Sequence, residues 1–256
     1  MDHALGQPAA VETPHVRRVP ITQAIQWLRL GYLDLTRSGW PSLAYGAAIS
    51  VFGMLLLALA WGSAYLVPAL IGGFLLVAPF AAIGLYAMSA QLEHRSPVDP
   101  GAALFAWRRN AGSIALFGLM LAVSLILWER LAAIVFVLSY GGNVPDLSSV
   151  ARDVLFSGDY LPLLLSFFGL GAGFALMVFT LSVVSAPMLL DRPVDPVTAA
   201  ITSMRCCLAN PGAMALWAAL IAGLTLIGFA TAMLGLIVIF PWLAHATWRA
   251  YRDLVA

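Results

Sequence analysis

The stretch RSPVDP at residues 95–100 returns almost unchanged as RPVDP at residues 192–196. Each copy follows a long apolar run and leads, through a break centred on an asparagine, into another apolar run. Asp99 and Asp195 each precede a proline, and an aspartate N-cap followed by proline at the first helical position is a favoured helix start. The pattern therefore predicts a repeated unit in which a short helix leads into a membrane hairpin.

The composition is that of a protein embedded in a bilayer. Of its 256 residues, 62% are hydrophobic and 10% are charged, and the mean hydropathy is +0.93. Soluble domains are much less apolar, whereas a hydrocarbon core about 30 Å thick requires about 20 apolar residues per helix. We predict an all-α polytopic membrane protein with six transmembrane helices, at about 42–61, 67–92, 112–138 and 161–190, with two more within 212–248.

The last apolar run decides whether the number of spans is even. As a single helix, its 37 residues would measure ~55 Å, well beyond the thickness of a bilayer. We expect a reversal near 231–235 that gives two spans with almost no loop; the alternative is one long span with the C-terminus on the opposite side. The prediction is a disordered tail at 1–20, then three hairpin units at 21–93, 97–191 and 193–252. Hairpins in the same orientation imply a pseudo-threefold axis along the membrane normal.

Arginine placement predicts the orientation, because cytoplasmic loops carry an excess of basic residues. Eleven of the 13 arginines fall on one side of the six-span scheme, so both termini are expected in the cytoplasm. The short helix of each unit is expected to lie on the cytoplasmic leaflet. In the first unit this helix has an apolar stripe: Ile21, Ala24, Ile25, Leu28, Tyr32 and Leu35.

Three other stretches resemble a known family. They are WLRLG at 27–31, VVSAPMLLDR at 183–192 and GLIVIFPWLAHATW at 235–248, and they resemble bacterial integral membrane proteins catalogued as domain of unknown function 2189. The resemblance covers about Ile21 to Arg252. It implies a six-span inner-membrane protein of Gram-negative bacteria with no assigned reaction, although some members carry the label of a cytochrome c oxidase subunit.

The histidines argue against an oxidase centre in this chain. Haem and copper sites need several imidazole ligands inside the spans, and of four histidines only His245 falls in a predicted span. We expect His245 to be a polar interfacial residue near the cytoplasmic end of that span. The adjacent Cys206 and Cys207 form neither a metal-binding motif nor a favourable disulfide. No cofactor or metal is predicted.

Glu129 and Arg130 are the most unusual pair, because they fall inside the predicted span 112–138. A charge in the hydrocarbon costs at least ~2.5 kcal/mol on insertion scales unless it is paired or reaches the interface. Three interpretations stay open: a structural anchor, a polar site facing the bundle interior, and a proton or substrate relay. Together with His245, this pair is the candidate intramembrane polar site.

The sequence favours a function without enzymatic chemistry. It contains no serine-hydrolase, zinc-protease or phosphate-loop motif. We predict a scaffold or accessory factor in the bacterial inner membrane, with the lipid bilayer and other inner-membrane proteins as partners and no nucleic acid. The alternative is a transporter or channel for a small solute or lipid. Gly169, Gly171 and Gly173 lie on no single helix face, so they predict no clean seam for helix association.

Overall fold

The computed structural model describes residues 14–59, 78–140 and 161–256, and within these ranges the chain is helical apart from its turns and one isolated bridge. The all-α prediction is confirmed. The helices are α1 (Gln23–Ser38), α2 (Trp40–Leu59), α4 (Ile83–Glu93), α5 (Pro100–Leu104), the 3-10 helix η1 (Ala106–Asn110), α6 (Ala111–Tyr140), α8 (Leu161–Ser182), α9 (Ser185–Asp191), α10 (Pro196–Ala209), α11 (Pro211–Ala230) and α12 (Leu236–Leu254).

Four stretches of the described chain are long and apolar enough to cross a membrane: Trp40–Ala58, Ala106–Val135, Phe168–Asp191 and Pro211–Ala230. They match the first, third, fourth and fifth predicted spans. The first part of the second predicted span, 67–77, lies outside the described residues, and the rest of it overlaps the 11-residue helix α4. The sixth corresponds to α12, which carries charged residues in its C-terminal half. Six spans and the threefold repeat therefore stay predictions.

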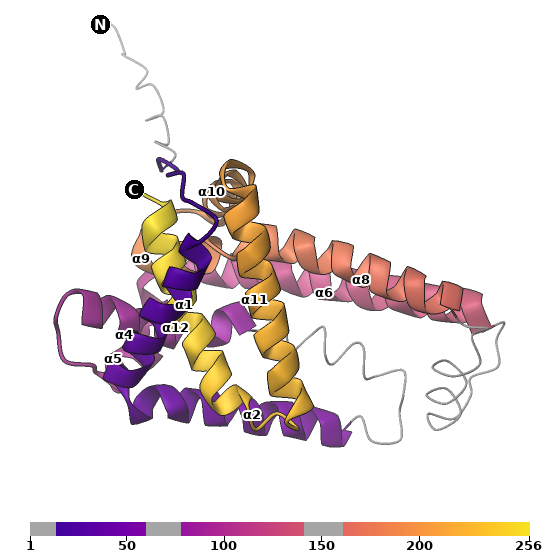
Figure 1. The fold of residues 1–256 in the computed structure, drawn as a ribbon, viewed down its shortest axis with the longest axis horizontal. Coiled ribbons are helices and arrows are strands. Elements are labelled where there is room, and N and C mark those ends of the chain that lie inside the picture. Colours follow the sequence, from indigo (N-terminus) through magenta and orange to yellow (C-terminus); the bar gives the residue numbers. More distant parts are fainter. Residues whose placement is uncertain (1–13, 60–77, 141–160) are drawn as a thin grey trace, which may run out of the picture.

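The predicted local signals for helix boundaries are present. Asp99 Oδ1 accepts from the backbone N–H of Ala102 at 3.0 Å, and Asp195 Oδ1 accepts from those of Val197 and Thr198 at 2.9 Å each. The last apolar run breaks at the expected reversal, because α11 ends at Ala230 and α12 begins at Leu236. These two helices then run in opposite directions (Figure 1).

Helix α12 lies at the centre of the fold, with 13 of its 19 residues buried. It packs against α1, α2, α4 and α11, and most extensively against α1. A Cβ on Gly31 would lie only 2.5 Å from the backbone nitrogen of Ala246. Only a glycine at this position lets the two backbones come so close, and this contact fixes the register between α1 and α12.

The face that α1 buries coincides only in part with its predicted apolar stripe, because it shares Ala24 and Leu35 with that stripe. Ala24, Trp27, Gly31, Asp34, Leu35 and Ser38 are buried, whereas Ile21 and Ile25 of the predicted stripe are each 56% exposed. Ile21, Ile25 and Tyr32 of the predicted stripe thus point outward, while Trp27 and Leu35 point into the protein together with the small and polar residues of the buried face. This arrangement suits a helix whose outer face contacts lipid.

Residues 14–20 are held against the end of α12, whereas the sequence predicted that all of 1–20 is disordered; residues 1–13 lie outside the described chain. Val16 and Val255 form an antiparallel bridge. The Arg17 N–H donates to Leu254 O at 2.9 Å, and the Val19 N–H donates to Asn210 Oδ1 at 2.7 Å. These bonds give the segment a fixed path over the C-terminal end of α12.

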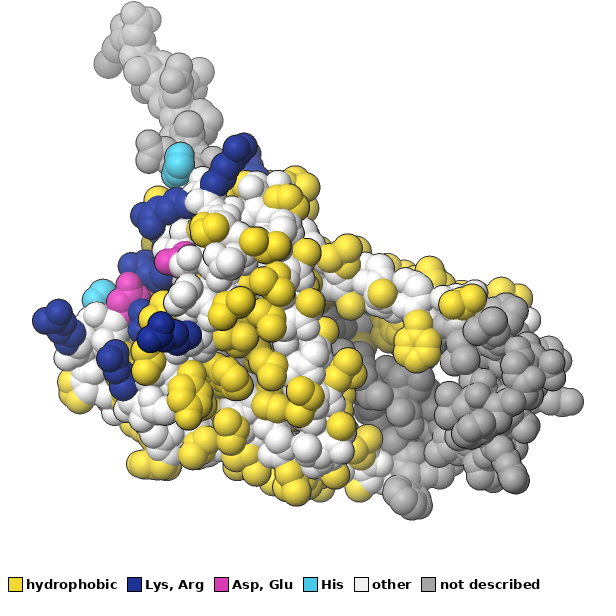
Figure 2. Space-filling view, viewed as in Figure 1, with side chains coloured by type: hydrophobic (Ala, Val, Ile, Leu, Met, Phe, Trp, Pro, Cys, Tyr) yellow, Lys and Arg dark blue, Asp and Glu magenta, His cyan; other side chains and the backbone are white. Residues whose placement is uncertain are grey.

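The helices extend in two directions from one charged end. In Figure 1, α6 and α8 run side by side away from the rest of the molecule, while α11 and α12 run across their direction. In Figure 2, the charged side chains on the visible face gather at the end where both termini lie, and the rest of that face is largely hydrophobic.

Candidate functional site

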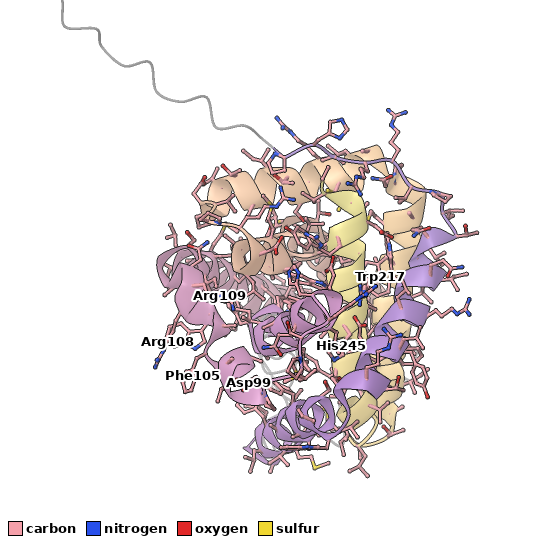
Figure 3. The ribbon with its side chains drawn as sticks, turned by 90° about the vertical axis from the view of Figure 1, so that its left-hand side faces the viewer. Asp99, Phe105, Arg108, Arg109, Trp217 and His245 are labelled. Carbon is pink, nitrogen blue, oxygen red and sulfur yellow. The ribbon has the colours of Figure 1, made fainter. Side chains whose placement is uncertain are left out.

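His245 lies in the interior of the protein, where helices α1, α2, α4 and α12 meet (Figure 3). Its Nε2 is 2.9 Å from Ser42 Oγ and 3.4 Å from Ser38 Oγ, and its Nδ1 is 2.7 Å from Ser89 Oγ. The imidazole is fully buried, because α1, α2 and α4 each present a serine to the same point of α12. The position near the cytoplasmic membrane interface stays a prediction.

The cluster continues from Ser89 to a buried ion pair. Ser89 Oγ donates to Asp34 Oδ2 at 3.0 Å, and Arg249 binds the same carboxylate through Nε at 2.7 Å and Nη2 at 2.6 Å. The Asp34 side chain is 1% exposed and that of Arg249 is 20% exposed. Arg249 therefore joins the buried cluster to the charged end of the molecule.

The donors fix the direction of this hydrogen-bond chain. An ionised carboxylate only accepts, so the Ser89 hydroxyl gives its proton to Asp34 and must accept from His245 Nδ1–H. In a neutral imidazole with its proton on Nδ1, Nε2 carries the lone pair and accepts from Ser42. The order is Ser42 to His245 to Ser89 to Asp34, and Arg249 neutralises the final charge.

This order resembles the nucleophile, base and acid of a hydrolase, but its setting is that of a structural cluster. Ser42, Ser89 and His245 are all fully buried, so a substrate cannot reach the hydroxyl. Within the described ranges there is no group of three or more His, Cys, Asp or Glu residues placed to hold a metal. What the arrangement does is satisfy polar groups from four helices and hold these helices in one register.

A second polar layer lies nearer the charged end. Arg252 pairs with Glu93 through Nε at 3.1 Å and with Asp191 through Nη1 at 3.3 Å. The Tyr251 hydroxyl donates to Asp191 at 2.6 Å and accepts from Arg192 Nε at 3.1 Å. Burial, followed by the hydrogen bond to Asp191, raises the pKa of the Tyr251 phenol. This layer ties α12 to α4 and α9.

Glu129 and Arg130 are not part of either polar layer. They pair with each other, with Arg130 Nε 3.1 Å from Glu129 Oε2, and their side chains are 37% and 73% exposed respectively. They lie on α6, which extends away from α12 (Figure 1). Trp128 next to them is buried and packs on Phe174 of α8, with ring centroids 5.8 Å apart. Of the three candidate residues, only His245 is inside the core.

Sequence reasoning missed Asp34, Ser38, Ser42, Ser89 and Arg249. One signal was available for part of this set. Asp34 and Ser38 continue the helical spacing of Ala24, Trp27 and Gly31, and a carboxylate on the same helix face as a tryptophan and two small residues indicates a buried polar contact. Nothing local to Ser42 or Ser89 marks them, because scattered serines in apolar helices usually bond only to their own backbone.

Comparison with known proteins finds one protein family that matches the central part of the chain. The family described as "Predicted integral membrane protein (DUF2189)" matches residues 66–191. This segment is similar to that family. The match confirms the resemblance and includes residues 183–191 of one motif, while the other two motifs lie outside it. No curated protein and no solved structure matches the chain.

The DUF2189 segment supplies only part of the polar cluster. It contains α4 and α9, and hence Ser89, Glu93 and Asp191. The flanking helices α1, α2 and α12 supply the remaining members. The polar layers therefore join the family segment to both flanks, and the chain is an integral membrane protein whose core needs all three parts.

Proposed function

We propose that this chain is a non-enzymatic scaffold or accessory factor for other membrane machinery in the bacterial inner membrane. The proposal rests on how little of two membrane-spanning helices is buried by the rest of the chain. In the most apolar part of Ala106–Val135 only 22% is buried, and the share for Pro211–Ala230 is also 22%. Such surfaces are available to lipid and to the helices of other membrane proteins.

Although the three glycines together predicted no clean seam, the surroundings of two of them on α8 offer one for such a partner. A Cβ on Gly171 would lie 3.0 Å from the Trp128 ring of α6, whereas a Cβ on Gly169 or Gly173 would meet nothing within 4 Å. Gly171 thus serves the contact inside the chain. Gly169 and Gly173 are four residues apart and both exposed, which is the spacing that lets two membrane helices approach closely.

Purification of tagged protein in a mild detergent tests this proposal. The wild type is expected to carry a reproducible partner, and the double variant Gly169→Ile/Gly173→Ile is expected to lose it because the bulky side chains keep helices apart. Gly223→Ile is the matched control, since Gly223 is also open but lies on α11. A partner that is absent from the wild type, or equally retained by the seam variant, would count against the scaffold role.

Cytoplasmic termini are supported by the charges. The visible arginines gather near both termini (Figure 2), and cytoplasmic surfaces are rich in basic residues. At this proposed interface, Phe105 and Arg108 point outward (Figure 3), with the Arg108 guanidinium 4.4 Å from the Phe105 ring centroid. An exposed aromatic ring beside an arginine suits the headgroup region. The outward Glu129–Arg130 pair suits an anchor on the opposite side.

A repeated architecture is supported by two equivalent hydrogen bonds. At the break that ends the second unit's short helices, Asn110 Nδ2 donates to the carbonyl of Arg192 at 3.4 Å. At the corresponding break of the third unit, Asn210 Nδ2 donates to the carbonyl of Arg17 at 3.0 Å. Each asparagine thus binds the segment that precedes the short helix of the following unit, with the third unit followed in space by the first. Such a cyclic order is what three related units around an axis would give.

The alternative function is a transporter or channel for a small solute or lipid, and the polar chain from Ser42 to Arg249 is the observation in its favour. Transporters place polar groups inside the bundle, where an ionisable residue marks a candidate pathway. Solute flux into liposomes distinguishes the two functions. Flux by the wild type that is lost in His245→Ala and kept in Glu129→Gln would support transport, and no flux for any solute class would retire it.

A further inference from the structure

An open cavity of about 410 Å³ lies at the charged end of the molecule, above the second polar layer. Four arginines line it against two acids: Arg17, Arg192, Arg249 and Arg252 with Glu93 and Asp253. Both acids already have partners, because Glu93 accepts from Arg252 and Trp248, while Asp253 accepts from Gln23 and Trp27. The side chains that line the cavity thus include two more arginines than acids, and Asp34 and Asp191 pair with Arg249 and Arg252 from outside the lining.

Three of these arginines are held in place by bonds to other residues of the protein. Arg249 binds Asp34, Arg252 binds Glu93 and Asp191, and Arg192 binds the Tyr251 hydroxyl and the carbonyl of Ala256. Each arginine uses two of its three guanidinium nitrogens in these bonds. A guanidinium has five N–H donors in a planar fork, so each keeps an amino group that is oriented by its neighbours and available to a ligand.

Arg17 is different, because its side chain has no acidic partner among the described residues. Its backbone is nevertheless fixed at both ends of the residue, by the bonds to Leu254 O and from Asn210 Nδ2. Arg17 is exposed, so water screens much of its repulsion with the other three arginines. What it offers an anion is a guanidinium whose N–H donors have no acidic partner within the described chain.

The positions of Arg17 and Arg192 are equivalent in the proposed repeat. Both carbonyls accept from the asparagine of the preceding break, and both residues lie two before a valine, Val19 and Val194. Both side chains line the same cavity. Packing alone gives no reason for two related segments to bring an arginine to one point.

We propose that this cavity binds a phosphate group, carried either by a free phosphate ion or by an anionic phospholipid headgroup. Arginine forks match the geometry of phosphate oxygens, and the volume is within the range of small-ligand sites. The site goes beyond the scaffold role, which requires no ligand. Arg17 supplies the unpaired charge, and Arg192, Arg249 and Arg252 supply oriented N–H donors.

The test measures thermal unfolding and calorimetric binding of the whole chain in a non-ionic detergent. One arm adds sodium phosphate, with sodium chloride at matched ionic strength, because salt screens surface charges. A second arm adds phosphatidylglycerol to the micelles, with phosphatidylcholine as comparison. Each arm is run on wild type, Arg17→Gln and Arg18→Gln. Arg18 is the matched control, since it is the adjacent exposed arginine but does not line the cavity.

We expect stabilisation of wild type and Arg18→Gln, and binding roughly tenfold or more weaker in Arg17→Gln, as loss of hydrogen bonds to a charged group implies. An effect of phosphate ion identifies a free ion as sufficient, and an effect of phosphatidylglycerol alone identifies the lipid. Equal responses of the two variants, or no response in either arm, would overturn the proposal. Unfolding without ligand shows whether Arg17→Gln keeps the stability of the wild type.

Discussion

Replacing Arg249 with methionine will leave the buried carboxylate of Asp34 without its counter-charge. Asp34 is 1% exposed, so water cannot take the place of the guanidinium. Removing one partner of a buried ion pair typically costs about 3–5 kcal/mol. We expect the lower end, about 3 kcal/mol, because Arg249 is itself 20% exposed and solvent therefore screens part of its attraction to Asp34.

The reverse substitution should be milder. In Asp34→Leu, the Arg249 side chain can turn into the cavity that it lines and be hydrated there. In the double variant no charge is left buried, and the main loss is the acceptor of the Ser89 hydroxyl, about 1 kcal/mol. The double variant should therefore be more stable than Arg249→Met alone. Because Asp34→Leu also loses this acceptor, at about 1 kcal/mol, the coupling energy in the double-mutant cycle is about 3 kcal/mol.

Thermal unfolding in detergent, followed by circular dichroism, measures these differences. For a chain of this size, about 1 kcal/mol corresponds to about 2–4 °C in Tm, so Arg249→Met should lower Tm by about 6–12 °C. Arg29→Met is the control, because Arg29 is exposed and forms no ion pair within the described chain; its Tm should change little. A double variant that is as unstable as the sum of the singles would refute the assignment of Asp34 and Arg249 as a buried pair.

Three further predictions concern other elements. Asp195→Ala should lower stability by about 1 kcal/mol through loss of the N-cap of α10. The Thr198 hydroxyl and backbone N–H lower the pKa of Asp195. The stabilisation by this cap is therefore present at neutral pH and is lost as the pH falls through that lowered pKa. Burial raises the pKa of Cys206 to about 12, so its thiol should resist maleimide at pH 7.5 until the protein unfolds. Gly31→Ala should cost about 1–3 kcal/mol by forcing α1 away from Ala246, as thermal unfolding will show.

Each of these predictions has a control on the same chain. Asp195→Asn should keep most of the cap, since asparagine caps about as well as aspartate. Rapid labelling of Cys206 in the folded protein would contradict its burial. Gly112→Ala should be neutral or slightly stabilising, because a Cβ on Gly112 would meet nothing within 4 Å and alanine is the better helix former. Equal losses at Gly31 and Gly112 would argue against a close approach of α1 and α12.

Several features of the fold could be predicted from the sequence because they depend on neighbours in the chain. An aspartate before a proline starts a helix whatever lies around it, and Asp99 and Asp195 both cap as expected. The length of an apolar run limits how far it can extend in a bilayer, and the last run does reverse between Ala230 and Leu236. The family of residues 66–191 is also a property of sequence.

What only the tertiary structure decided is which helix faces meet. Asp34 and Arg249 are 215 positions apart, and no local pattern links them. The three glycines of α8 have different surroundings. Gly171 lies against the Trp128 ring, whereas a Cβ on Gly169 or Gly173 would meet nothing within 4 Å.

The physical reason is that an apolar helix can bury any of its faces at similar cost in a bilayer, because lipid tails are as apolar as leucine. Composition therefore places a segment in the membrane without orienting it. The orientation is set by the few polar and small groups that need a partner, and for His245 these partners come from α1, α2 and α4.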